Sequence, residues 1–145
     1  MNETIGIVGL GLIGGSMARA YKLAGWSVLG SDLDQTTLGY AVIANIINRP
    51  LDDTNMSKCD VLMLALYPQA TITWLQNHAS KIPSTCTVID LCGTKKSVCE
   101  AGFALAKEHG FLFVGGHPMA GKERGKFQNA AEDLPLLEPF LEAEC

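Results

Sequence analysis

His117 is the residue of this sequence whose type and surroundings best suit acid–base chemistry. It follows an apolar run and two glycines, which let another molecule approach the backbone. Pro118 biases it towards an extended conformation, which holds the direction of the ring. A neutral imidazole, with a pKa of about 6.5, can take a proton from a hydroxyl group while hydride leaves the same carbon. The alternative is a histidine packed in a loop, and the glycines and the location favour the catalytic role.

The pattern Gly9-x-Gly11-x-x-Gly14 is a second feature with chemical meaning. Gly9 would make the tight turn out of a strand, Gly11 would leave room for a pyrophosphate, and Gly14 would let a helix pack against the strand. The free amides of the helix's first turn would face the phosphates, so Leu12 and Ile13 are also cofactor-binding candidates. The pattern alone is weak evidence, because S-adenosylmethionine methyltransferases use similar loops.

Asp32 supports a dinucleotide site, because it lies 23 residues after Gly9 at the end of an expected strand. An acid in this place accepts hydrogen bonds from the adenosine ribose. Its carboxylate would repel a 2′-phosphate, and residues 33–35 contain no Arg or Lys to receive one. NAD is therefore favoured over NADP as the cofactor. The alternative is that Asp32 and Asp34 merely cap the following helix.

Apolar periodicity predicts strands that alternate with helices along the whole chain. The expected strands are residues 4–8, 26–31, 46–47, 60–66, 86–90 and 111–114, and the expected helices are 13–24, 33–44, a segment around 72–79 and one around 98–106. Such alternation implies a parallel sheet with helices on both faces and right-handed crossovers. We therefore predict an α/β, Rossmann-type doubly wound domain.

In such a sheet the ligand lies across the carboxyl ends of the strands. This rule nominates the turns at residues 66–68, 91–94 and 115–118. Cofactor contacts are expected at Leu66, Tyr67, Pro68, Cys92 and Gly93. Pro68 equally well starts a helix, where proline is common in the first turn.

Composition indicates one globular domain, with 145 residues, 48% of them hydrophobic and 18% charged. A net charge of −4 and the absence of a Lys/Arg cluster argue against a nucleic-acid partner. No apolar run approaches the roughly 18 residues of a membrane span. We find no hydrophobic leader, and we therefore expect a cytoplasmic protein that acts on a small molecule.

The cysteines and histidines give no sign of a metal site. The five cysteines are odd in number and form no CxxC pair, which favours reduced thiols. The three histidines, His78, His109 and His117, lie far apart without metal-ligand spacing. His78 and His109 fall on expected helices and are interpreted as structural. We predict that the protein binds no metal.

Three segments resemble the signatures of prephenate dehydrogenases, in the order in which that family has them. They are residues 9–16, 90–95 and 116–123, and the His-Pro-Met-Ala-Gly-x-Glu segment is the most specific of them. The resemblance spans residues 1 to about 131. It implies NAD-dependent oxidative decarboxylation of prephenate to 4-hydroxyphenylpyruvate in tyrosine biosynthesis, with arogenate as the related substrate.

The resemblance also implies roles for single residues. His117 would be the catalytic histidine, hydrogen-bonded to the substrate's ring hydroxyl. Glu123 matches an acid near the substrate entrance, and Lys95 matches the lysine after the fifth strand; each is equally well a surface residue. Many members carry a serine that assists the histidine where this chain has Gly93, and Thr94 beside it is a candidate for that role.

The last residues depart from the family pattern. The family continues into a helical domain for substrate binding and dimerisation, whereas residues 132–145 form an atypical, apolar tail. The tail is interpreted as a truncation or a change of reading frame, and the alternative is a short terminal helix or an arm packed on the sheet. Otherwise its leucines would form an exposed patch that favours self-association. Two functions stay open on the sequence: a prephenate or arogenate dehydrogenase, with a homodimer as one state, and an NAD-binding module without catalysis.

Overall fold

The structure is a computed structural model that describes residues 3–93, 95–118 and 141–143. The described residues form one sheet in the order β3-β2-β1-β4-β5-β6-β7. The strands are β1 (Thr4–Val8), β2 (Ser27–Ser31), β3 (Arg49–Pro50), β4 (Val61–Leu64), β5 (Thr87–Asp90), β6 (Leu112–Pro118) and β7 (Leu141–Ala143). Strands β1 to β6 are parallel, and β7 pairs antiparallel with β6 at the edge.

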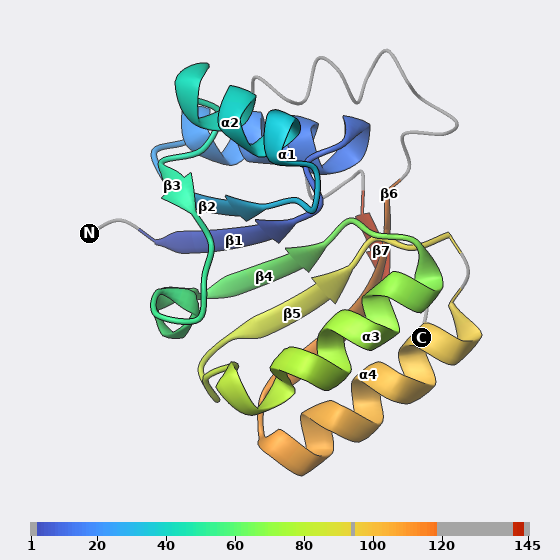
Figure 1. Ribbon diagram of the computed structural model, residues 1–145. Coiled ribbons are helices and arrows are strands. Elements are labelled where there is room, and N and C mark those ends of the chain that lie inside the picture. The colour runs from blue at the N-terminus through green and yellow to red at the C-terminus, as the bar shows by residue number, and fades with distance from the viewer. Residues whose placement is uncertain (1–2, 94, 119–140, 144–145) are drawn as a thin grey trace.

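Helices connect the parallel strands and cover both faces of the sheet (Figure 1). The α-helices are α1 (Leu12–Leu23), α2 (Gln35–Ile43), α3 (Pro68–His78) and α4 (Lys96–His109), and the 3₁₀ turns are η1 (Met56–Lys58) and η2 (Ala79–Lys81). Helices α1 and α2 lie on one face, and α3 and α4 pack side by side on the other. The predicted doubly wound α/β fold is confirmed.

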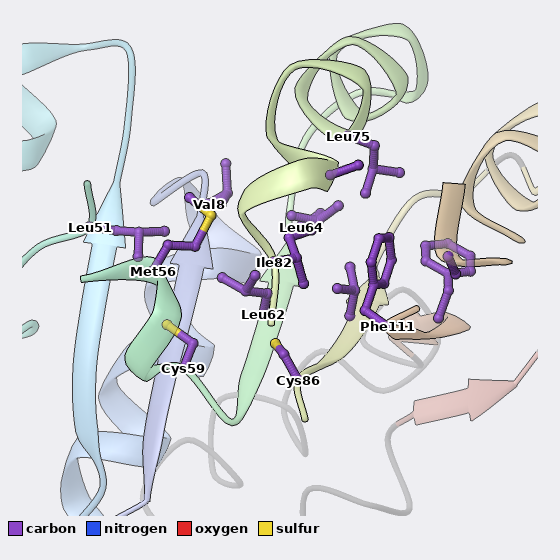
Figure 2. Packing of buried hydrophobic residues seen from close by; sticks show 14 of the residues in the cluster. Val8, Leu51, Met56, Cys59, Leu62, Leu64, Leu75, Ile82, Cys86 and Phe111 are labelled. Carbon is purple, nitrogen blue, oxygen red and sulfur yellow. The ribbon is translucent and has the colours of Figure 1, made fainter. Parts of the chain in front are cut away.

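Two apolar cores, one on each face, hold the layers together. Side chains of a strand alternate between the faces, so Leu62 and Leu64 of β4 point towards α3 and α4, whereas Met63 points towards α1 and α2. All three are fully buried, as expected for a central strand of a parallel sheet. Figure 2 shows the core under α3, where Leu75 packs near Leu64 and the Cys59 and Cys86 side chains lie beneath Leu62.

The expected strand at residues 46–47 is wrong, because β3 is Arg49–Pro50. Ile47 is buried in the core under α1 and α2 instead of being paired in the sheet. Asn48 explains why the third strand begins later than expected. Its amide donates to Val28 O and its Oδ1 accepts from Val28 N, both at 2.7 Å. An asparagine side chain thus occupies the edge of β2 before the short third strand begins.

The last parallel strand extends further than the sequence indicated. It was expected to end at residue 114, but β6 continues to Pro118. Gly115 still pairs with Asp90 of β5, and the next residues pair with β7. His117 therefore lies within a strand, and not in a loop beyond it. Of the expected tail, residues 141–143 pair with β6 as β7, and the other tail residues lie outside the described part of the structure.

The described cysteines only partly match the expectation of reduced thiols. Cys59, Cys86 and Cys92 are free and buried. Cys99, in α4, is disulfide-bonded, so the expectation fails there. No helix in the described part of the chain has the length and apolar character that crossing a membrane requires.

Candidate dinucleotide-binding site

The glycines of the turn after β1 and of the first turn of α1 serve different structural purposes. Gly9 has a φ of +94°, and a Cβ there would lie 2.4 Å from Ala65 O. A Cβ on Gly14 would lie 1.7 Å from Gly9 O, so this glycine lets α1 approach the turn. At Gly11 a Cβ would meet nothing within 4 Å. The fold therefore requires Gly9 and Gly14, whereas Gly11 leaves open space for another molecule.

Helix α1 begins at this turn with unpaired backbone donors. Gly11 is its N-cap and provides no side-chain cap, and the first turn contains no acidic residue. The first intrahelical bond runs from Gly15 N to Gly11 O at 2.7 Å. The preceding amides, including those of Leu12 and Ile13, have no acceptor within an α-helix. Together with the helix dipole they form a site suited to an anion such as a pyrophosphate.

Asp32 connects the end of β2 to the glycine turn. Its Oδ2 accepts a hydrogen bond from Leu10 N at 2.8 Å, and its Oδ1 accepts one from Asp34 N at 2.9 Å. The helix cap is the neighbouring Asp34, which accepts from Thr36 N at 3.0 Å. Hydrogen bonds from the Thr37 hydroxyl and from the Thr36 amide lower the pKa of Asp34. The capping alternative thus holds for Asp34, and Asp32 is free of that task.

A groove of about 740 Å³ lies between α1 and α2. Its walls include Gly11 and Leu12 at one end and Leu23 and Asn45 at the other. The turns after β4 and β5 are not among its described walls. The groove therefore meets the expected cofactor path at the glycine turn and then follows the helices away from it.

The turn after β4 leads directly into α3. Tyr67 is the N-cap with an exposed side chain, and Pro68 is the first helical residue. The expected helix-starting role of Pro68 is therefore confirmed, and its contact with a cofactor stays a prediction. The Thr71 hydroxyl donates to Tyr67 O at 3.0 Å and keeps this first turn closed.

Cys92 joins the turn after β5 to the turn after β4. Its thiol donates to Leu66 O at 3.1 Å and lies 3.1 Å from Thr71 Oγ1. Burial raises the pKa of this thiol, and the nearby Asp90 adds to the shift. Cys92 is therefore a protonated structural donor near neutral pH, and not a nucleophile. The adjacent Gly93 faces open space.

Asp90, which ends β5, is not among the site residues predicted from the sequence. It is fully buried, and its Oδ2 lies 2.6 Å from Lys95 Nζ in an ion pair. The same oxygen accepts a hydrogen bond from Cys92 N at 3.2 Å, whereas Oδ1 has no partner. Only 10% of the Lys95 side chain is exposed, so the interpretation of Lys95 as a surface residue is wrong. A carboxylate at the end of an apolar strand, five residues before a lysine, was the signal available in the sequence.

His117 is placed by its backbone. It lies two residues beyond Gly115, the partner of Asp90, and opposite Glu142 of β7. His117 thus lies at the carboxyl edge of the sheet, on the strand next to β5. The ligand was expected at this edge. The His117 side chain, Thr94 and Glu123 lie outside the described part of the structure. No group of three potential metal ligands occurs among the described residues.

The described residues define a nucleotide-binding domain of the Rossmann type. Its features are the parallel sheet in the order β3-β2-β1-β4-β5-β6, the glycine turn after β1 and the acid after β2. Comparison with known families gives the same class. The family described as "Prephenate dehydrogenase, nucleotide-binding domain" matches residues 17–139. The chain belongs to the prephenate dehydrogenase family.

Individual relatives agree with this assignment. The prephenate dehydrogenase of Bacillus subtilis (strain 168) is 30% identical over 139 residues, which are 92% of this chain and 37% of the relative. The crystal structure of prephenate dehydrogenase from A. aeolicus in complex with hydroxyphenyl propionate and NAD+ has a TM-score of 0.70 and 25% identity, and the match covers 83% of this chain and 43% of that one. Synechocystis arogenate dehydrogenase has a TM-score of 0.72 and 27% identity, with 80% and 41% covered. The chain thus spans less than half the length of these dehydrogenases.

Proposed function

We propose that this chain is the NAD-binding part of a prephenate dehydrogenase. The observation that carries the proposal is the Asp32 carboxylate, which is bonded to the glycine turn and is not used as a helix cap. In that place it can accept hydrogen bonds from the adenosine ribose and repel a 2′-phosphate. The A. aeolicus relative, whose structure contains NAD+, supports the same cofactor.

The cofactor would lie across the carboxyl edge of the sheet. Its pyrophosphate would meet the amides of Leu12 and Ile13 beside Gly11, where a side chain is absent. Its other half would then cross β1 towards the turns at residues 66–68 and 92–93, because the strand order reverses between β1 and β4. When bound, NAD supplies the hydride acceptor.

In the proposed reaction His117 takes the proton of the substrate's ring hydroxyl while the carbon that carries this hydroxyl gives up a hydride. The bond between the ring and its carboxylate then breaks, and its electron pair makes the ring aromatic as CO₂ leaves. The proton held by His117 returns to the phenolic oxygen. Thr94 and Glu123 are proposed to assist at the substrate, and the protein acts chiefly by positioning the ring.

A second candidate is a module that binds NAD without catalysis. It is supported by the described residues, whose glycine turn and Asp32 concern cofactor binding, in a chain that spans 37% of the Bacillus subtilis enzyme. The activity of the longer relatives therefore does not follow from family membership alone. Arogenate is the alternative substrate, in line with the Synechocystis relative. The division into a domain of residues 1–131 and a tail of 132–145 is part of the proposal, and β7 places residues of that tail in the same sheet.

Calorimetric titration of the chain with NAD and NADP, followed by a prephenate-dependent NADH assay, tests the proposal. We expect NAD to bind more tightly than NADP, and turnover to be lost in His117→Asn while NAD binding persists. NAD binding without turnover by the unchanged chain would favour the non-catalytic module. Equal or tighter binding of NADP would contradict the role given to Asp32.

A further inference from the structure

We infer that the buried Asp90–Lys95 pair, with Cys92 and Thr71, is a positioning unit that holds the turns after β4 and β5 against the nicotinamide half of the dinucleotide. The inference rests on the proposed function and deepens it. None of these four residues needs to contact the cofactor's reacting atoms. Their task is to fix the spacing of the two turns on which that half of the cofactor would lie.

The contacts form a continuous chain between the two turns. Lys95 Nζ lies 2.6 Å from Asp90 Oδ2, and the same oxygen accepts from Cys92 N at 3.2 Å. The Cys92 thiol donates to Leu66 O at 3.1 Å, in the turn after β4. Thr71 Oγ1 lies 3.1 Å from the same thiol, and its hydroxyl donates to Tyr67 O in the first turn of α3. A displacement of either turn therefore strains or breaks a buried polar contact.

The location of Lys95 argues against an ordinary structural cation. It is the N-cap of α4, where the helix dipole disfavours positive charge, and Lys96 follows it. The first turn of α4 contains no acidic residue to offset these charges. Asp90, at the end of β5, offsets the charge of Lys95 instead, but its carboxylate is buried and its Oδ1 has no partner. Two lysines at the start of α4 and a buried carboxylate with an unpartnered oxygen do not favour helix stability. We explain the pair by the two turns whose spacing it fixes.

The unit lies on the opposite side of β1 from Asp32. The strand order puts β2, and with it the adenosine end, on one side of β1, and β4 and β5 on the other. A dinucleotide that is anchored at Asp32 and at the glycine turn must extend its second half over the turns after β4 and β5. Loss of the unit should therefore weaken binding of the nicotinamide half and leave the adenosine half unchanged.

The same unit reaches the strand that carries His117. Asp90 pairs with Gly115 of β6, and a Cβ on Gly116 would lie 3.1 Å from Asp90 O and 2.9 Å from Ile89 Cγ2. The end of β5 and the end of β6 are thus in close backbone contact. A fixed Asp90 also fixes the part of β6 from which His117 follows.

The test compares the affinities of the full chain for NAD and for ADP-ribose, which lacks the nicotinamide. In Lys95→Met we expect NAD to bind at least about tenfold more weakly, because displaced binding groups lose much of their effect, and ADP-ribose to bind as before. The double variant Asp90→Asn/Lys95→Met removes the uncompensated buried charge, so it tests the unit without that source of unfolding. We expect the same selective loss of NAD affinity there.

Lys81→Met is the matched control, because it removes a lysine from the exposed ion pair with Asp53. It should change neither affinity. Recovery of normal NAD affinity in the double variant, or equal weakening of both ligands, would overturn the inference and show a merely structural pair. Failure of the unchanged chain to bind either ligand would overturn the proposed function and this inference with it, whereas normal binding with an unchanged ratio in Lys95→Met would overturn this inference alone.

Discussion

The carboxylate of Asp32 accepts a hydrogen bond from the amide of Leu10 at 2.8 Å, which ties the end of β2 to the turn after β1. One oxygen thus holds the glycine turn, and the other accepts from the amide of Asp34. The acid is fixed in orientation before any ligand arrives. This preorganisation reduces the ordering that binding would otherwise require.

Replacement of Asp32 by alanine should weaken NAD binding and reduce the preference for NAD over NADP. Hydrogen bonds to charged groups contribute about 1.5–3 kcal/mol, which corresponds to roughly tenfold or more in affinity. The 2′-phosphate of NADP would also lose a repelling charge. Titration with both cofactors measures the change. Asp34→Ala is the control, since it removes the cap of α2 and should leave the NAD to NADP ratio unchanged.

Alanine at Gly11 and at Gly14 should have opposite consequences. A Cβ at Gly11 meets nothing within 4 Å, and its φ of −72° suits alanine, so Gly11→Ala should fold normally and bind NAD weakly. A Cβ at Gly14 would lie 1.7 Å from Gly9 O, so Gly14→Ala should lose about 3 kcal/mol of stability through overpacking. Urea unfolding and NAD titration of both variants check this. Normal NAD affinity in Gly11→Ala would contradict a cofactor path over that residue.

The sequence predicted those features that depend on local patterns. Apolar runs identified the central strands, and the glycines and Asp32 identified the turn, because each has a reason within a short segment. Asp90 was missed because its importance arises from burial between the sheet and α4, which no local pattern displays. The end of β6 was misplaced for a related reason, since its last residues pair with β7, more than twenty residues further along the chain.

Burial of Cys59 and Cys86 should make stability fall at alkaline pH. Burial raises the pKa of each thiol from 9.0 to about 12, with smaller contributions from Asp60. Because the pKa is raised in the folded chain, the unfolded chain releases these protons at lower pH. The contribution of the two thiols to the free energy of unfolding is therefore fully present below about pH 9 and is lost as pH rises towards 12. The free energy of unfolding, measured with urea across this pH range, should fall more steeply with pH than in the double variant Cys59→Ala/Cys86→Ala. Equal slopes, or rapid labelling of both thiols in the folded chain near pH 8, would contradict the burial of these groups.

Gly102 and Phe113 should be energetically coupled. A Cβ on Gly102 would lie 2.4 Å from the Phe113 ring, so this glycine sets how closely α4 packs on β6. Gly102→Ala should cost about 1–3 kcal/mol through overpacking. Phe113→Leu should make room for the added methyl group, so the double variant should be more stable than the sum of the two single changes predicts, by roughly 0.5–3 kcal/mol. Urea unfolding of the four chains completes the cycle, and strictly additive effects would mean that α4 and β6 are not packed through this contact.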